Sequence, residues 1–138
     1  MKVFLDTNVV IDFYDKRGDF YFPAAVIIDL AFKGKIELYV SSVTFVNAFF
    51  ILRKSYDSHE LYQSMRGLAS MCRITLVDEN VIKKSLEAES NDFEDCVQYE
   101  SASLHDVDVI VTRNVKDFKD FEADVKTPHE FLDSFMQA

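Results

Sequence analysis

The chain has 138 residues, the size of one ordinary domain, and we expect a single domain over residues 1–138. Apolar residues make up 49% and charged residues 28%, which is typical of a folded globular chain and excludes a disordered one. The low counts of 3 Gly and 2 Pro also argue against a turn-rich all-β sandwich. The formal net charge of -9 argues against a general basic surface for nucleic acid, but leaves room for an enzyme that meets nucleic acid through a bound cation.

We expect a cytoplasmic protein, because the sequence shows no pattern of a secretion signal or a membrane span and its two cysteines are not arranged as a pair. Few apolar residues precede the acidic Asp6, whereas a secretion signal needs an apolar stretch of about 7–15 residues. No segment approaches the roughly 20 apolar residues of a membrane span, so no membrane partner is expected. Cys72 and Cys96 are far apart in the sequence and form no C-x-x-C pair, which predicts two reduced, mostly buried thiols.

Strand and helix patterns alternate along the chain. In chain order we expect a strand at 2–5, helices at 8–14 and 23–34, a strand at 37–40, helices at 43–54 and 58–71, a strand at 73–77, helices at 79–89 and 92–103, strands at 109–111 and 124–126, and a closing helix from 128. Pro23 is the predicted start of the second helix, and Thr127 to Glu130 reads as a capping box. This order predicts the α/β class, a three-layer α/β/α sandwich with a short central parallel sheet.

Acidic and amide side chains follow the strands that the pattern predicts. Asp6 follows the first strand, Asn114 and Asp117 follow the fourth, and Asp92 and Asp95 open the helix at 92–103. Sites in open α/β sheets form beyond the carboxyl ends of the strands. If the first and fourth strands are neighbours, these groups meet at one edge of the sheet.

Converging carboxylates repel one another and stay ionised only beside a cation. Oxygen ligands without a cluster of His or Cys select a hard ion such as Mg²⁺ or Mn²⁺, which can activate water for attack on a phosphodiester. Each acid also has a structural reading that stays open here. Asp6 and Asp92 can cap the helices that follow them, Asp95 can stabilise a helix dipole, and Asp117 can be a turn residue.

Four segments resemble the PIN domain family, metal-dependent ribonucleases that include the toxins of VapBC-type toxin–antitoxin pairs. They are residues 4–12 (FLDTNVVID), 92–95 (DFED) with Ala102, 112–118 (TRNVKDF) and 127–132 (TPHEFL). The resemblance covers essentially the whole chain and implies a PIN-like fold. It implies an Mg²⁺- or Mn²⁺-dependent endoribonuclease, acting as the toxin of a type II toxin–antitoxin pair, with RNA as substrate, a small antitoxin as partner and a homodimeric state.

Carried over position by position, the resemblance implies that Asp6 and Asp95 are the metal ligands. With Asp117 they form the expected catalytic set. Arg113 and Lys116 are expected to contact substrate phosphates, with a solvated surface role as the alternative for each. The supporting residues that the resemblance implies are Thr7, Asn8, Asn47, Asp92, Thr112 and Asn114.

Asn47 departs from the pattern of the family. The third helix of PIN domains usually carries a Glu that enters the site, and Asn47 occupies the matching position. An amide offers a neutral oxygen but no charge, so we expect weaker metal binding or a loss of catalysis. The alternative function is therefore a catalytically weak or inactive PIN scaffold that binds RNA or a protein partner. The same helix is apolar nearly all round, which indicates either core burial or an interface with a second copy or a partner helix.

Overall fold

The computed structural model describes residues 1–137 and contains a five-stranded sheet in which all paired strands are parallel. The strand order is β3-β2-β1-β4-β5. The strands are β1 (Lys2–Leu5), β2 (Glu37–Ser41), β3 (Cys72–Thr75), β4 (Val109–Val111) and β5 (Val125–Lys126). This architecture confirms the α/β class and the parallel sheet predicted from the sequence.

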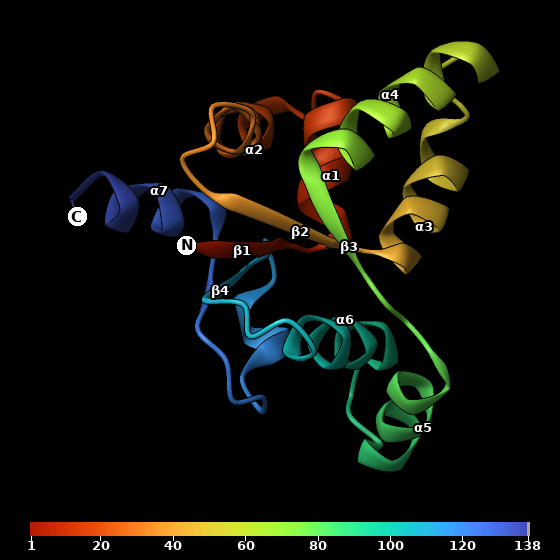
Figure 1. The fold of residues 1–138 in the computed structure, drawn as a ribbon, viewed down its shortest axis with the longest axis vertical. Helices are drawn as coiled ribbons and strands as arrows, with labels where there is room; N and C mark the ends of the chain where they lie inside the picture. The colour runs from red at the N-terminus through yellow and green to blue at the C-terminus, as the bar shows by residue number, and fades with distance from the viewer. Residues whose placement is uncertain (138) are drawn as a thin grey trace.

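Helices cover both faces of this sheet (Figure 1). Contacts between α1 and α2, α1 and α3, and α2 and α7 build one layer, and the α5–α6 pair builds the other. The helices are α1 (Thr7–Tyr14), α2 (Gly18–Phe32), α3 (Ser42–Leu52), α4 (Ser58–Met71), α5 (Glu79–Ala88), α6 (Phe93–Ser103) and α7 (Pro128–Gln137), with a 3₁₀ turn η1 (Val115–Phe118) after β4. The three-layer arrangement is therefore also as predicted.

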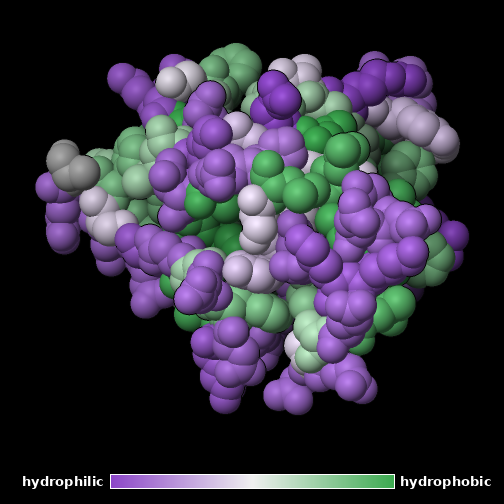
Figure 2. Space-filling model, turned by 60° about the horizontal axis from the view of Figure 1, so that its bottom comes forward, coloured by the Kyte–Doolittle hydropathy of each residue, from purple (hydrophilic) through white to green (hydrophobic). Residues whose placement is uncertain are grey.

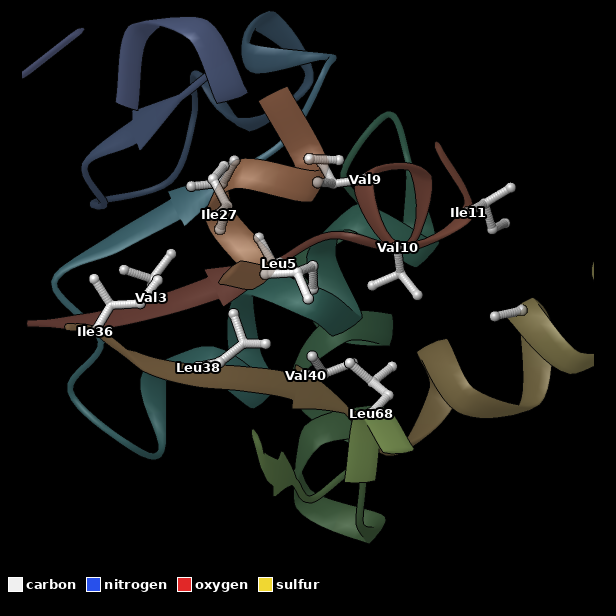
Figure 3. Close-up of a cluster of buried hydrophobic side chains, with 14 of the residues drawn as sticks. Val3, Leu5, Val9, Val10, Ile11, Ile27, Ile36, Leu38, Val40 and Leu68 are labelled. Carbon is white, nitrogen blue, oxygen red and sulfur yellow. The ribbon is translucent and has the colours of Figure 1, made fainter. Parts of the chain in front are cut away.

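Alternate residues of the strands supply two separate cores. Val3 and Leu5 point into a large cluster with residues of α1, α2, α3, α4 and α7, in which Val10, Val40 and Leu68 also lie (Figure 3). Phe4, between them, points into a smaller cluster on the α6 side. Successive strand side chains face opposite sides of a sheet, so a short apolar strand between two helix layers is buried on both faces.

β1 lies in the middle of the sheet, with β2 and β3 on one side of it and β4 and β5 on the other. After β3 the chain crosses to the other side of β1 through α5 and α6, and β4 pairs with β1 in parallel, with Leu5 opposite Val111. The amide of Asp6 extends this pairing by donating to the carbonyl oxygen of Val111 at 3.0 Å. β1 and β4 are therefore neighbours, as the predicted gathering of the acidic and amide side chains requires. The residues that follow these two strands meet at the switch point, where α/β proteins place their sites.

The structure corrects the predicted start of the second helix. α2 begins at Gly18 rather than at Pro23, which lies inside the helix. Proline lacks an amide hydrogen, so it leaves the carbonyl of Asp19 without its usual helical donor. The extra turn places Phe20 under the guanidinium of Arg113, 4.2 Å from the ring centroid, and this tertiary contact is invisible to a local pattern.

α3 is not buried on every side. Its inner face is buried through Thr44, Ala48 and Leu52, whereas Val46 and Phe50 are 70% and 57% exposed. Core burial therefore accounts for only part of its apolar composition.

Figure 2 shows the face of the molecule that is seen when the lower side of Figure 1 is turned toward the viewer. Hydrophilic residues cover much of this face, with apolar areas between them. Within residues 1–137, no helix has the length and apolar character that crossing a membrane requires.

Candidate active site

Asp6 is the most tightly held acid of the candidate site. It is 3% exposed, and both of its carboxylate oxygens accept hydrogen bonds. Oδ1 accepts from the amide of Thr7 at 2.8 Å and from the side-chain amide of Gln98 at 3.1 Å. Oδ2 accepts from the hydroxyl of Thr112 at 2.8 Å, and Asn8 lies 3.5 Å from the same oxygen. Asp6 thus caps α1 and also presents a fixed carboxylate at the switch point. A role as a helix cap is therefore compatible with a place in the acidic site.

Gln98 connects Asp6 to the start of α3, and sequence reasoning missed it. Its Nε2 also lies 2.9 Å from the hydroxyl of Thr44 and 3.2 Å from that of Thr7, while its Oε1 accepts from the hydroxyl of Ser41. The side chain is fully buried, so every one of these contacts is shielded from water. The available signal was spacing, because Gln98 follows Asp95 by three residues and therefore shares its helix face.

The predicted acids gather around one cavity of about 300 Å³. Asp92 caps α6 by accepting from the amide of Asp95 at 3.0 Å, which places both residues in the first turn at the cavity wall. The structure brings together seven of the predicted site residues there, and adds Glu94 and Arg17. The cavity is lined by Asp6, Thr7, Asn8, Ile11, Arg17, Ile51, Asp92, Glu94, Asp95, Asn114 and Asp117.

The carboxylates of this cavity are electrostatically crowded. Burial, and then the negative charges of Asp6 and Asp92, raise the pKa of Asp95 to about 7. Burial also raises the pKa of Asp6, although the hydrogen bonds from Gln98 and Thr112 oppose that effect. The pKa of Glu94 is raised mainly by burial and next by Asp6. Negative charges that disfavour one another in this way are stabilised by a cation among them.

Four predicted site residues lie outside the lining of this cavity. Thr112 stands behind it as a donor to Asp6. The Nε of Arg113 lies 2.8 Å from Oδ2 of Asp12, so this cation pairs with a buried acid of α1. Lys116 lines a neighbouring cleft. Asn47 is half-buried on α3, whose contribution to the cavity wall is Ile51, one turn further along.

The donor set of the cavity fits a hard divalent cation. All its acidic ligands are oxygen donors, and no His or Cys lines the cavity. Within residues 1–137, no three acidic, His or Cys side chains are close enough to form a ready-made metal cluster. Mg²⁺ does not require one, because proteins usually bind it through one or two carboxylates, with water and substrate phosphates completing the shell.

A parallel sheet of order 3-2-1-4-5 with carboxylates collected at its switch point defines a PIN-like α/β protein. The family model described as "PIN domain" matches residues 2–116. The chain therefore belongs to the PIN domain family, as its sequence motifs indicated.

Individual relatives cover nearly the whole chain. Ribonuclease VapC1 of Aquifex aeolicus (strain VF5) is 25% identical over an alignment of 137 residues, and the match covers 96% of this chain and 94% of the relative. A toxin–antitoxin complex from Klebsiella pneumoniae contains a chain that is 23% identical and superimposes with a TM-score of 0.67, covering 93% of this chain and 98% of that chain. VapBC2 of Rickettsia felis, solved with a promoter DNA fragment, gives 19% identity, a TM-score of 0.65, and coverage of 91% and 97%.

Proposed function

We propose that this protein is a metal-dependent endoribonuclease that hydrolyses RNA phosphodiesters. The observation that carries the proposal is the collection of five carboxylates around one cavity at the switch point, with Asp6 held by three hydrogen bonds. Such a site binds a hard cation and, with it, an anionic substrate. The relative named ribonuclease VapC1, which matches almost end to end, supports RNA as the substrate class.

In this proposal Asp6 and Asp95 hold Mg²⁺ or Mn²⁺, and Asp92 and Asp117 assist directly or through water. When bound, the cation supplies a positive charge that polarises the phosphoryl oxygens and makes a water molecule more acidic. Thr112 and Gln98 keep the carboxylate of Asp6 oriented. A carboxylate of the cavity accepts the proton of the attacking water.

The remaining predicted residues have shaping and binding roles in the proposal. Thr7 and Asn8 form the turn around Asp6, and the hydroxyl of Thr112 accepts from the amide of Asn114 at 3.1 Å, which shapes the loop after β4. Lys116 contacts a substrate phosphate from the neighbouring cleft. A contact between Arg113 and a second substrate phosphate stays a prediction, although the Nε of Arg113 is turned toward Asp12.

The cellular role that we propose is that of a toxin neutralised by a small antitoxin protein. The support is that two of the structural neighbours are described as a toxin–antitoxin complex and as VapBC2. We also propose a homodimer that acts in the cytoplasm. The exposed apolar side chains of α3 support an interface with another polypeptide.

Incubation with RNA tests the nuclease proposal. Purified chain is mixed with a heterogeneous RNA pool in Mg²⁺, in Mn²⁺ and in chelator, beside the variant Asp6→Asn. Cleavage that needs the cation and disappears in Asp6→Asn supports the proposal. Absence of cleavage by a folded wild-type chain contradicts it, and equal cleavage by wild type and variant identifies a contaminating nuclease.

One observation favours a second candidate function, a PIN scaffold that binds RNA or a protein without cutting. Asn47 replaces the acid that the family resemblance implies at this position. The variant Asn47→Glu separates the candidates. If the wild-type chain binds RNA but does not cleave it, and Asn47→Glu gains cation-dependent cleavage, the scaffold is the better description. Comparable cleavage by both chains shows that the acid is not needed at this position.

A further inference from the structure

The chain carries few cations near its acidic cavity, and their positions define a path for substrate. Arg17 is the one cationic side chain among the residues that line this cavity. Beyond Asp92 and Asp117 opens a second cleft of about 170 Å³, in which Lys116 and Lys119 are the cations. Because Asp92 and Asp117 line both spaces, the cavity and the cleft are adjacent. We propose that single-stranded RNA crosses the acidic cavity between two phosphate contacts, Arg17 on one wall and Lys119 in the second cleft.

The backbone around Arg17 is bent in a way that places this side chain at the cavity. Lys16 and Gly18, its two neighbours, both have positive φ values, of 50° and 49°. A left-handed conformation at a residue with a side chain costs of order 1 kcal/mol and persists only where the surrounding structure enforces it. The amide of Arg17 helps to enforce it by donating to the carbonyl of Asp12 at 3.1 Å.

The side chain of Arg17 is anchored at one point. Its Nε donates to Oδ2 of Asp15 at 3.1 Å. The terminal amino groups of the guanidinium carry four further N–H donors, and their planar fork matches two oxygens of a phosphate. An anchored arginine loses less conformational freedom when it binds than a free one does. Arg17 is therefore suited to contact a phosphate that enters the acidic cavity.

The second cleft presents a different combination of groups. Lys116 and Lys119 are three residues apart across the 3₁₀ turn η1, and side chains with this spacing in a 3₁₀ helix lie on the same face. Phe121 also lines the cleft and stacks on Tyr99, with ring centroids 4.6 Å apart and planes 10° apart. Acidic neighbours are present too, because Asp120 lines the cleft beside Asp92 and Asp117.

These features favour a single strand over a duplex. The carboxylates repel the RNA backbone, so attraction is limited to the bound cation and to the lysines and arginine that flank it. Aromatic side chains bind bases of single strands, whose faces are exposed, whereas the bases of a duplex are already stacked. A strand that places one phosphate in the cavity can place the next nucleotide against Phe121 and its phosphate near Lys119. This proposal rests on the proposed ribonuclease function and adds the path of the bound strand across the site.

The test measures kcat/KM for a labelled single-stranded oligoribonucleotide at several salt concentrations. The variants are Arg17→Ala and Lys119→Ala, and the matched controls are Lys33→Ala and Lys83→Ala, which remove exposed lysines paired with acids on other surfaces. We expect Arg17→Ala to lower kcat/KM about tenfold and Lys119→Ala about threefold. Each should also reduce the slope of log kcat/KM against log salt by about 0.7, the amount for one lost phosphate contact on a single strand. The controls should change neither quantity.

Thermal unfolding of each variant shows whether it is folded, and a structural defect alone does not change the salt slope. If a folded Arg17→Ala or Lys119→Ala retains the wild-type kcat/KM and slope while the wild type cleaves RNA, the path is wrong and the nuclease proposal stands. If the wild type does not cleave, binding of the same oligonucleotide in Mg²⁺ replaces the kinetic measurement. Weaker binding with a reduced slope then supports the path without the nuclease function. Unchanged binding, or no binding by the wild type, overturns the path.

Discussion

At the residue scale, the geometry of the candidate site depends on a buried amide. Among residues 1–137, Gln98 is the only side chain that touches Asp6, Thr7, Ser41 and Thr44 together. A carboxylate that is nearly excluded from water needs such donors, because an unsatisfied buried charge is more costly than the hydrogen bonds that replace its hydration.

Removing this amide should destabilise the fold and disorganise the site. We expect Gln98→Ala to lower the free energy of unfolding by about 2–4 kcal/mol, because it leaves a cavity and several buried polar groups without partners. The same variant should lose most RNA cleavage even where it is folded. Urea unfolding measures the first effect, and Gln63→Ala on the exposed face of α4 is the matched control. A loss below about 0.5 kcal/mol, the range of surface substitutions, contradicts the role given to Gln98.

The raised pKa of Asp95 predicts how pH affects the metal-free protein. Its folded-state pKa of about 7 lies above the ordinary value of 3.8 for an aspartate, so the folded chain binds this proton more tightly than the unfolded chain does. The associated stability is fully present below about pH 4 and is lost as the pH rises through 7. Without a cation, the folded protein should therefore be less stable at pH 8 than at pH 5. Added Mg²⁺ should reverse much of this loss, because it replaces the proton among the carboxylates.

The melting temperature in chelator and in Mg²⁺, measured between pH 4 and pH 8.5, checks this prediction. Other groups titrate in the same range, so the informative quantity is the difference between wild type and Asp95→Asn. The variant should lose much of the fall in stability toward pH 8 and much of the gain from Mg²⁺. If wild type and variant show the same pH dependence, Asp95 does not bind a proton as described.

At the element scale, one ion pair between a buried acid and a partly exposed arginine joins α1 to the loop that follows β4. Asp12 is 1% exposed, and its Oδ2 lies 2.8 Å from Nε of Arg113 without the angle of a hydrogen bond. Arg113 also covers the ring of Phe20 on α2, and its amide donates to Oδ1 of Asn8 at 3.3 Å. The arginine therefore connects both N-terminal helices to the loop that carries Asn114 and Asp117.

This pair predicts a stability effect for a residue that the sequence assigned to substrate. We expect Arg113→Ala to lower the free energy of unfolding by about 3–5 kcal/mol, because it leaves Asp12 as a buried charge without a partner. The double variant Asp12→Leu/Arg113→Met should recover most of that loss, since apolar groups of similar volume need no partner. Denaturant unfolding of the single and double variants gives the comparison, with Lys116→Ala as the exposed control. No recovery in the double variant contradicts this reading and leaves the substrate role of Arg113 as the better one.

Local signals in the sequence predicted the elements well where the local chemistry decides the structure. Thr127 and Glu130 exchange the two hydrogen bonds of a capping box, at 2.9 and 3.1 Å, and α7 begins where that motif places it. The apolar run at residues 109–111 is a strand buried on both faces, as a central parallel strand must be. The predicted start of α2 was wrong because a contact between residues far apart in the chain stabilises the extra turn. This contact joins Phe20 and Arg113.

The same distinction applies to the candidate site. Asp6, Asp92, Asp95 and Asp117 line one cavity. This grouping could be predicted because strand ends and helix caps can be recognised in the sequence. Buried partners such as Gln98 were missed, because a polar residue within a helix has no local mark of burial beyond its spacing from a candidate acid. The roles of the individual acids stay predictions, and the nuclease assay with Asp6→Asn is their most direct test.

At the scale of the whole molecule, one group of exposed apolar side chains forms a surface on α3 and α4. Phe45, Val46, Phe49 and Phe50 of α3, with Arg53 and Tyr62, line an open groove of about 440 Å³, the α3–α4 surface. The guanidinium of Arg53 lies 4.0 Å from the ring centroid of Phe50. Aromatic residues together with arginine are enriched at protein interfaces. With a net charge of -9, copies of the chain repel one another, so an apolar surface is the most direct means of association.

The predicted homodimer is therefore expected to use the α3–α4 surface. In light scattering coupled to size exclusion, the wild-type chain should have twice the mass of one chain, and Val46→Glu and Phe50→Glu should each give monomers. A buried glutamate opposite an apolar surface costs more than a dimer of ordinary size, about 800 Å² per partner, can recover. Phe32→Glu is the control, because Phe32 is 78% exposed on α2, outside this surface, and its variant should remain dimeric. A monomeric wild type, or a dimer that only Phe32→Glu dissociates, would assign the α3–α4 surface to a different partner.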